Sequence, residues 1–340
     1  MSTSPSSSPS GPTVLTIVLN YKTAEMTLQS VQAARTAMEN ISGGIVVVDN
    51  DSQDGSYEAI LAHVTQEGWD KEDAVRVIQA GRNGGFGAGN NVGIKAGLPD
   101  GSIPDYIYVL NSDAFPAPNA IHKLLEHLEA NPKSGFAGSY IHGPEGDRQQ
   151  SAFRFPSIMS EFEGSVRLGL LTTLLKNYRV PMEIPTQTGP VNWVAGASML
   201  MRQSVLNQIG LFDETFFLYF EEVDLCRRAG QAGYSTDYVP ASKVTHIGSV
   251  STGMKEWKRV PSYWYDSRWH YFSKNHGAFY AMTATMAHLC GGFLHALRCL
   301  ILRRDRHVTP GFLKTMVTHD FRALIRRPTS SPLKESQSSI

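Results

Sequence analysis

Carboxylates occur at two places in the sequence where they could bind a cation or move a proton. Asp113 closely follows the apolar run 106–110, and prolines just behind it stop that run from continuing. Glu221 and Glu222 follow a second apolar run, 216–220. A buried strand that ends at a carboxylate delivers it to a crevice, where it can ligate a divalent cation, and a carboxylate beside a hydroxyl can remove its proton. The sequence therefore indicates a cation site and an acid–base site.

The second carboxylate group also allows a simpler interpretation. Acidic side chains in the first turn of a helix stabilise its positive end. Asp224, in the same group, can form an ion pair with Arg227 or with Arg228, which lies one helical turn later. This account does not explain why the acids follow an apolar run that presses them against the core. Both interpretations stay open on these residues alone.

A glycine-rich segment, 81–93, holds six glycines in thirteen residues. Glycine lets backbone N–H groups approach an anion, and a helix that begins near Ala88 would add its positive end. The pattern favours a turn that holds phosphate groups, with a flexible loop as the alternative. A dinucleotide cofactor site is disfavoured because the segment follows the third predicted strand and not the first.

Strands and helices alternate around these segments in the order typical of a parallel sheet. The carboxyl ends of such strands meet at one edge, where ligands bind. We expect strands at 14–19, 45–48, 75–78, 106–110 and 135–141, and helices at 23–38, 56–66 and 119–130. Farther along we expect an irregular insertion or lid at 142–190 with a helix near 159–176, a strand at 191–201, a helix at 203–209, a helix that opens at the acidic group, a strand at 236–240 and a short segment at 243–249.

Composition limits the classes of partner. The 31 basic and 31 acidic residues give a net charge of zero, so bulk attraction for nucleic acid is missing and we expect no such partner. The three cysteines fit neither a zinc spacing nor a disulfide framework, which is typical of a cytoplasmic protein. Residues 1–12 and 328–340 are polar and are expected to be disordered tails, the first of them not a signal peptide.

The segment 279–302 is apolar but is interrupted by two histidines and Arg298, and the basic stretch 303–307 follows it. Its length would span a bilayer, yet the interruptions favour an amphipathic helix that lies on a membrane with its basic residues toward anionic lipid. An ordinary helix packed on the domain is the alternative. We expect a helical, membrane-associating extension over 277–327, on the inner face of the cytoplasmic membrane.

Eight short motifs, in this order and spacing, resemble the bacterial inverting glycosyltransferases of family 2, and most closely their rhamnosyltransferase-like branch. They are VLNY at 18–21, VDNDSQD at 48–54, NGGFGAGNNVG at 83–93, LNSD at 110–113, WVAGA at 193–197, FDE at 212–214, FEEVDLC at 220–226 and HIGS at 246–249. The resemblance implies the GT-A fold, an α/β domain at 13–276 whose Rossmann-like, mostly parallel central sheet is flanked by helices. Its nucleotide-binding half would be 13–113 and its acceptor-binding half 114–276, with the helical extension after them.

The resemblance places the donor, a nucleoside-diphosphate sugar, at the strand ends and the glycine-rich segment. Tyr21 is expected to contact the base, and Asp49 matches a position that hydrogen-bonds a pyrimidine-type base edge. By residue type alone, both would be interpreted as turn or capping residues. The residues expected at the donor are Asn20, Tyr21, Asp49, Asp51, Arg82, Asn83, Asn90, Asn111 and Ser112.

Residues 111–113 stand where the family has an Asp-x-Asp metal signature, but Asn111 replaces the first carboxylate. Asp113 is then expected to ligate the ion, with Asn111 in a lesser role at the ribose or at a water. His246 matches a histidine that completes the metal site in some relatives. Because only one anionic protein ligand remains, the ion would depend on the diphosphate, which suits Mg²⁺ or Mn²⁺.

The resemblance also assigns the proton transfer. Glu222 matches the second acid of the family's Glu-Asp motif and is expected to be the general base, one methylene longer than the usual Asp. Glu221 would order the site. Trp193, Gly196 and Asp224 fall on the acceptor side, where Asp224 keeps its alternative role in an ion pair.

The resemblance therefore implies a metal-dependent, inverting hexosyltransferase. The favoured reaction moves rhamnose from a dTDP donor to a hydroxyl of a lipid-linked or cell-surface glycan. The alternative is a non-catalytic nucleotide-sugar-binding protein of the same fold. The amide at Asn111 makes that alternative conceivable, whereas the presence of Asp113, Glu222 and His246 argues against it.

Overall fold

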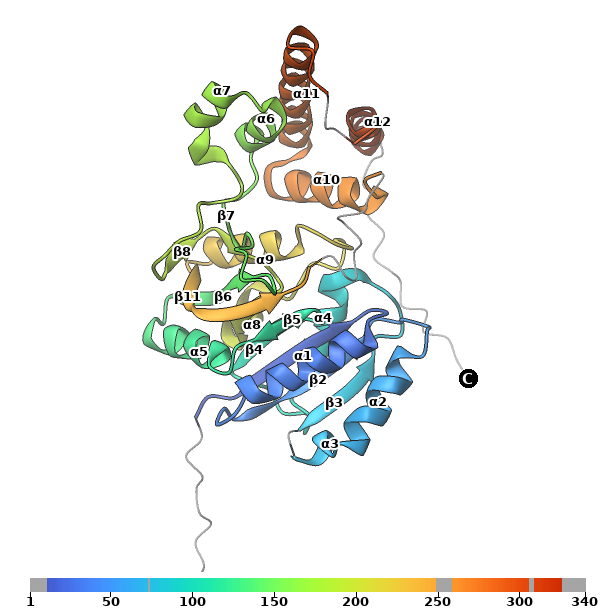
Figure 1. Ribbon diagram of the computed structural model, residues 1–340, viewed down its shortest axis with the longest axis vertical. Coiled ribbons are helices and arrows are strands. Elements are labelled where there is room, and N and C mark those ends of the chain that lie inside the picture. Colours follow the sequence, from blue (N-terminus) through green and yellow to red (C-terminus); the bar gives the residue numbers. More distant parts are fainter. Residues whose placement is uncertain (1–10, 73, 249–258, 306–308, 326–340) are drawn as a thin grey trace, which may run out of the picture. The chain divides into compact units, whose positions relative to one another are not determined.

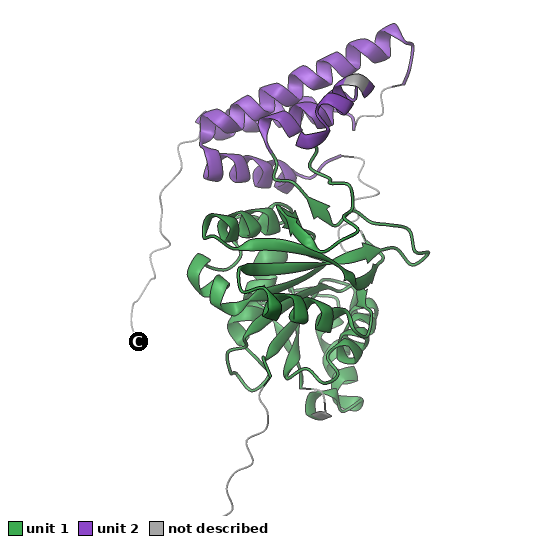
Figure 2. Ribbon diagram, turned by 90° about the vertical axis from the view of Figure 1, so that its left-hand side faces the viewer, with its two compact units in different colours: residues 1–156, 179–257 green, residues 157–178, 258–340 purple. Residues whose placement is uncertain are grey.

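The computed structural model of the protein describes residues 11–72, 74–248, 259–305 and 309–325. These residues form two compact units, shown in Figure 2. Unit 1 lies within Met1–Pro156 and Arg179–Trp257, and unit 2 within Ser157–Tyr178 and Lys258–Ile340. The predicted tails at 1–12 and 328–340 lie almost wholly outside the described residues.

The first half of unit 1 is a parallel sheet with its crossover helices (Figure 1). Its elements are β1 (Val14–Asn20), α1 (Ala24–Ala37), β2 (Gly43–Asp49), α2 (Ser56–Gln66), α3 (Trp69–Glu72), β3 (Val75–Gln79), α4 (Gly85–Ala96) and β4 (Tyr106–Asn111). Every strand here lies within about two residues of its predicted bounds. Helix α4 begins three residues before the expected Ala88, because Phe86 N donates to Phe217 O (2.9 Å) and fixes the first turn there.

The second half of unit 1 adds strands of both directions. Its elements are β5 (Ala114–Pro116), α5 (Ala120–Ala130), β6 (Ser134–His142), β7 (Ala152–Phe153), β8 (Gly189–Val191), β9 (Trp193–Val194), β10 (Ser198–Arg202), α8 (Gln203–Ile209), α9 (Glu221–Gln231) and β11 (Ser235–His246). The main sheet runs β3-β2-β1-β4-β10-β6-β11-β5, with β8 also paired to β11. Strands β5, β8 and β10 are antiparallel to their neighbours, so the sheet is mixed but mostly parallel, as predicted.

Both faces of this sheet are covered, which explains its continuous apolar strands. In β1, Val14 and Val18 pack with α1, α2 and α5, whereas Leu15 and Ile17 pack on the other face with α4, α8 and α9. The fold is therefore three-layered, with the site-bearing ends of β1, β2 and β4 aligned at one edge. Asn20 pairs with Asp49 in the sheet register.

Two predicted strands differ from the structure. The expected strand at 191–201 is divided among β8, β9 and β10, because Trp193 leaves the main sheet and stacks on Phe153 with ring centroids 3.9 Å apart. The expected pair of segments at 236–240 and 243–249 is largely one strand, β11. Its register against β6 shifts between Val239 and Lys243, around Pro240, which has no N–H to donate.

Unit 2 is helical. It contains α6 (Ile158–Val166), α7 (Gly169–Leu174), the 3₁₀ turn η1 (Lys176–Tyr178), α10 (Ser262–His276), α11 (Ala278–Ile301) and α12 (Phe312–Ile325). The middle of the predicted insertion, α6 and α7, thus belongs with the C-terminal helices. The predicted boundary at 276 also differs, because α10 carries the buried Arg268, which pairs with Glu161 on α6 and Asp320 on α12, both at 3.0 Å.

Candidate active site

The ends of β1 and β2 are tied together by buried side chains. Asn20 Nδ2 donates to Asp49 Oδ1 (2.6 Å) and Ser52 Oγ (3.2 Å), while Asn20 Oδ1 accepts from Thr27 Oγ1 (2.7 Å). Asp49 also accepts from the hydroxyl and the N–H of Ser52. Asn20 is fully buried and its amide groups are in use, so in this structure it supports the strand ends, and its contact with the donor stays a prediction.

Tyr21 and Asp51 follow these strand ends and are more accessible. Tyr21 is half-buried, with Lys22 Nζ 5.3 Å from its ring centroid. Asp51 is half-buried, adopts a left-handed backbone (φ 58°) and accepts from Gln53 Nε2 (3.0 Å). Both remain candidates for donor contact, as predicted.

Asn50 connects the end of β2 to the glycine-rich segment. Its Nδ2 donates to Asn83 Oδ1 (3.0 Å) and Gly85 O (3.2 Å), and Asn83 Oδ1 also accepts from Gly85 N (3.1 Å). The segment is therefore an ordered helix start and not a flexible loop. Sequence reasoning missed Asn50 because the polar residues on both sides of it gave no reason to single it out.

Two buried amide oxygens have no partner within the described chain, Asn50 Oδ1 and Asn90 Oδ1. Asn90 is fully buried on α4, where its Nδ2 donates to Phe86 O (2.9 Å). Arg82, by contrast, is largely exposed and pairs with Glu214 at 3.1 Å. A polar ligand at the start of α4 could donate hydrogen bonds to the two amide oxygens. An anionic group of the same ligand could pair with Arg82.

We expect Gly85→Ala to destabilise the protein far more than Gly101→Ala. Both glycines have a left-handed backbone, with φ +88° and +85°, which costs another residue about 1–3 kcal/mol. Only at Gly85 would the added Cβ meet another atom, Phe217 O at 1.7 Å. Chemical denaturation of both variants measures the difference, and equal losses of unfolding free energy would contradict the close contact between α4 and 217.

The Phe212–Glu214 motif is fastened onto α4. Asn91 Nδ2 donates to Phe212 O (2.9 Å), and Phe212 N donates to Asn91 Oδ1 (3.1 Å). The hydrogen bond from Asn91, followed by those from Lys95 and the nearby Arg82 charge, lowers the pKa of Glu214. This motif therefore holds the acidic segment against the glycine-rich helix. Gly87 allows α4 and the start of α9 to lie close together, since a Cβ at Gly87 would lie 3.5 Å from the Cβ of Glu221.

The predicted metal ligands come together at the end of β11. In the sheet register His246 pairs with Ala114, the residue after Asp113. His246 Nε2 lies 3.1 Å from Asp113 Oδ1 and 3.4 Å from Asn111 Nδ2. Asp113 is buried, and its Oδ2 accepts from Gly248 N (3.1 Å). Ser112 is also buried and its Oγ accepts from Thr23 Oγ1 (3.2 Å), which makes it a structural neighbour of this group.

This donor set fits a divalent cation that is also held by a ligand. A carboxylate and an imidazole nitrogen face the same point, a combination that Mn²⁺ accepts. Over the described residues, however, no group of three or more His, Cys, Asp or Glu side chains is arranged to hold a metal. Most of the ligands of the cation would therefore come from a diphosphate, which is what we expected from the single carboxylate, Asp113, in the 111–113 segment.

The two acidic residues that open α9 lie in an apolar setting. Glu221 is buried, Glu222 is half-buried, and one carboxylate oxygen of each has no partner within the described residues. Burial raises the pKa of Glu222 to about 7. Burial and the neighbouring Glu222 charge raise the pKa of Glu221 well above its usual range. A carboxyl group whose pKa is near neutrality is suited to act as a general base.

The three residues predicted on the acceptor side differ in accessibility. Trp193 is half-buried against Phe153, and a Cβ at Gly196 would lie 3.0 Å from the Phe86 ring. Asp224 is fully buried and pairs with Arg228 at 2.8 Å. The ion pair that the i,i+4 spacing of Asp224 allowed is therefore present, and its place on the acceptor side stays a prediction.

Gln149 is a further neighbour of the metal group that sequence reasoning missed. It lies between β6 and β7, and its side chain makes two hydrogen bonds to His246. No periodicity or charge pattern in 142–190 distinguishes it from Gln150 beside it. The contact spans 97 residues of sequence and becomes visible only in the folded chain.

Comparison with solved structures supports the fold. The chain is similar to GalNAc-T7 with UDP, GalNAc and Mn²⁺ (TM-score 0.54, 14% identity, 92% of this chain and 57% of that chain). It is also similar to the mannosyltransferase PcManGT of Pyrobaculum calidifontis with GDP-Man and Mn²⁺ (TM-score 0.51, 13% identity, 93% and 86%). At such identities these likenesses concern the fold alone, and they confirm the predicted GT-A-like architecture.

Sequence comparison identifies relatives among curated proteins. The chain is 32% identical over 220 residues to the N-acetylglucosaminyl-diphospho-decaprenol L-rhamnosyltransferase of Mycobacterium tuberculosis, covering 62% of this chain and 68% of that protein. It is 30% identical over 167 residues to rhamnosyltransferase WbbL of Escherichia coli, covering 48% and 60%. The family model for glycosyl transferase family 2 matches residues 13–210, more than half of the chain. The chain therefore belongs to glycosyl transferase family 2.

Proposed function

We propose that this glycosyltransferase is a metal-dependent, inverting enzyme that moves a sugar from a nucleoside-diphosphate donor to a hydroxyl of a glycan. The observation that carries the proposal is the setting of Glu222. One of its carboxylate oxygens is buried and has no partner among the described residues, and burial raises its pKa to about 7. An acceptor hydroxyl can donate a hydrogen bond to that oxygen and lose its proton there as it attacks the sugar.

The other residues of the site bind and orient. Asp113 and His246 would hold a divalent cation, with Asn111 beside them. When bound, the cation stabilises the negative charge that grows on the departing nucleoside diphosphate. The positive end of α4 lies at the glycine-rich segment and would favour the same negative charge. Burial and the neighbouring Glu222 charge raise the pKa of Glu221, which favours its neutral form beside Glu222. We assign one general base and no side chain that would form a covalent intermediate with the sugar. This favours a single displacement, which inverts the configuration at the anomeric carbon.

We favour rhamnose from dTDP-rhamnose as the donor. Support comes from the names of two relatives, both rhamnosyltransferases. The test is to incubate the purified protein with Mn²⁺ or Mg²⁺ and a panel of nucleotide sugars, and to follow the melting temperature and the release of nucleoside diphosphate. We expect dTDP-rhamnose with Mn²⁺ to give the largest shift. A larger shift with a UDP or GDP sugar would overturn this donor, and no shift with any sugar would overturn the donor site.

We propose a lipid-linked glycan as the acceptor and a membrane surface as a further partner. The Mycobacterium tuberculosis relative is named for a diphospho-decaprenol substrate. Most of the large apolar side chains that are exposed in the described residues belong to unit 2: Met159, Leu174, Tyr178, Phe279, Met286, Phe293, Leu294, Leu297, Leu300, Ile301, Leu302, Phe321, Leu324 and Ile325. A surface of this kind marks a site of protein or membrane interaction.

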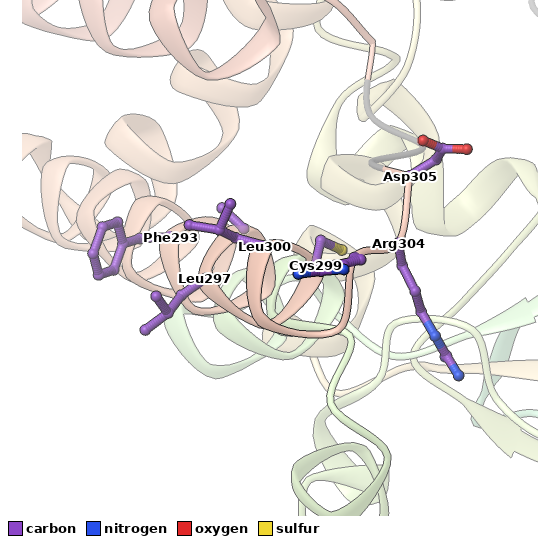
Figure 3. Close-up of a pocket in the computed structure, with 8 residues that line it drawn as sticks. Phe293, Leu297, Cys299, Leu300, Arg304 and Asp305 are labelled. Carbon is purple, nitrogen blue, oxygen red and sulfur yellow. The ribbon is translucent and has the colours of Figure 1, made fainter.

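The C-terminal half of α11 shows the proposed contact surface (Figure 3). Phe293, Leu297 and Leu300 recur at intervals of four and three residues, so they share one face of the helix, and Phe293 and Leu300 are 67% and 76% exposed. Together with Arg303, Arg304 and Asp305 they line a depression. By length and composition α11 is also long and apolar enough to cross a bilayer. The basic end favours attachment to anionic lipid on the cytoplasmic side.

Replacing Arg303 and Arg304 together by Gln is expected to weaken binding to anionic vesicles about 30-fold, since each basic residue near such a surface contributes about 1 kcal/mol. Vesicle sedimentation of the full-length protein measures this. The control, Lys133→Gln with Lys243→Gln, removes two exposed charges from unit 1 and should change nothing. Equal binding by the Arg303/Arg304 variant and the unaltered protein would contradict the membrane surface.

A further inference from the structure

Gln149 is half-buried and, within the described residues, its side chain makes two hydrogen bonds, both to His246. We propose that Gln149 is a positioning residue for the metal site, which holds His246 in the tautomer that presents the Nε2 lone pair to the cation. This inference rests on the proposed roles of Asp113 and His246 as metal ligands.

The orientation of the Gln149 amide follows from one contact. Its Nε2 lies 2.7 Å from His246 O, a carbonyl oxygen that can only accept, so the nitrogen of the amide must be there. The amide oxygen Oε1 is therefore the atom that lies 3.1 Å from His246 Nδ1. Because a carbonyl oxygen cannot donate, Nδ1 carries the hydrogen. In a neutral imidazole the lone pair is then on Nε2.

On the other side of the ring, Asn111 Nδ2, a donor, lies 3.4 Å from Nε2, and Asp113 Oδ1, an acceptor, lies 3.1 Å from it. Two acceptors this close need a positive charge between them, and the proposal gives that place to the cation. Gly248 lies beside the ring, since a Cβ there would be in ordinary contact with His246 Cε1, at 3.5 Å. The ring thus has one hydrogen-bonded nitrogen on the Gln149 side and one ligating nitrogen on the Asp113 side. Partners of this kind fix the orientation and tautomer of metal-binding histidines.

The position of Gln149 is itself fixed by the backbone. Its N–H donates to Ile141 O (3.1 Å), next to the bridge between His142 and Arg148. The turn is closed by Gly143 N, which donates to Asp147 O at 2.8 Å. A purely structural role, in which Gln149 only ties this turn to β11, would depend on the bond to His246 O. The proposed role depends on the bond to Nδ1.

Two substitutions separate these roles. Gln149→Glu keeps an acceptor for Nδ1–H but cannot donate to His246 O, whereas Gln149→Met loses both bonds. We expect Gln149→Met to bind Mn²⁺ about 10- to 100-fold more weakly in the presence of dTDP, the usual effect of losing such a partner. Gln149→Glu should stay within a few-fold of the unaltered protein. The control is Gln150→Met, since the Gln150 amide contacts Ala152 O and Met182 O and not the histidine.

Free Mn²⁺ measured by EPR gives these affinities without an activity assay. Long-range ¹H–¹⁵N NMR of the protein with Mg²⁺ and dTDP, with His246 assigned from a His246→Asn variant, reports the tautomer while the cation faces Nε2. We expect a protonated Nδ1 in the unaltered protein and in Gln149→Glu, and a mixture in Gln149→Met. Unchanged Mn²⁺ affinity in Gln149→Met, a loss in Gln149→Glu as large as in Gln149→Met, or an unprotonated Nδ1 in the unaltered protein would overturn the inference. If the unaltered protein itself binds no Mn²⁺ with dTDP, the metal role under the proposed function fails instead.

Discussion

Glu222→Gln is expected to lower kcat for sugar transfer by about 10²- to 10⁴-fold, the usual contribution of a general base. Gln has nearly the same shape but cannot take the proton of the acceptor hydroxyl. Nucleotide binding should be unchanged, because the side chain acts on the acceptor. Glu126→Gln, at an exposed carboxylate on α5 that pairs with Lys123, is the matched control and should keep full activity. Transfer that persists undiminished in Glu222→Gln would refute the assignment of the base.

The pH dependence provides a second readout of the same residue. Burial raises the pKa of Glu222 from 4.5 to about 7, and only the ionised form can accept a proton. We therefore expect kcat/KM to fall as the pH is lowered through about 7. The folded state holds this proton more tightly than the unfolded state, so stability that is present below about pH 4.5 is lost as the pH rises through about 7. Glu222→Gln should thus be more stable than the unaltered protein at about pH 8.5, which excludes misfolding as the cause of lost activity.

Asp113→Asn is expected to abolish the stabilisation that Mn²⁺ and a nucleoside diphosphate together give the protein. Asp113 is the one carboxylate at the proposed metal group, and Asn111 already supplies an amide beside it. A second amide would leave no anionic protein ligand for a hard cation. Thermal unfolding with Mn²⁺ and dTDP measures the effect, and we expect kcat to fall with it.

The matched control is Asp100→Asn. This exposed carboxylate accepts from Ser102 N (2.8 Å) in a turn, so its change to an amide should lower stability slightly and leave the Mn²⁺ effect intact. If Asp113→Asn responds to Mn²⁺ and dTDP like the unaltered protein, then the ion is held elsewhere or is dispensable. In that case the role of the 111–113 segment must be revised first.

The strand ends of the nucleotide-binding half could be predicted because strands buried on both faces are continuous apolar runs. Each run stops where a polar residue such as Asp49 or Asn111 begins. Parallel pairing then places those residues at one edge without any knowledge of side-chain contacts. The ion pair of Asp224 with Arg228 could likewise be foreseen, since helical spacing is local.

The contacts that could not be predicted join segments far apart in sequence. Gln149 reaches His246 only after the 142–148 turn and β11 have formed. Helix α6 packs closely on α11 in unit 2 because residue 291 is a glycine: a Cβ there would lie 2.1 Å from Ser165 Oγ. The hydrophobic periodicity of the sequence does not reveal such a close helix contact. The hydrogen bonds that occupy the Asn20 amide also could not be predicted, because residue type alone does not show which polar groups are already bonded.

Metal-dependent transfer with inversion is tested most directly by the configuration of the product. Full-length protein, Mn²⁺, the donor that stabilises it most and a glycan acceptor would be combined, and the anomeric configuration of the transferred sugar read by NMR. We predict a product whose anomeric configuration is opposite to that of the donor, formed with Mn²⁺ and not formed in the presence of a chelator. A product that retains the configuration of the donor, or equal yield with the chelator, would contradict the account.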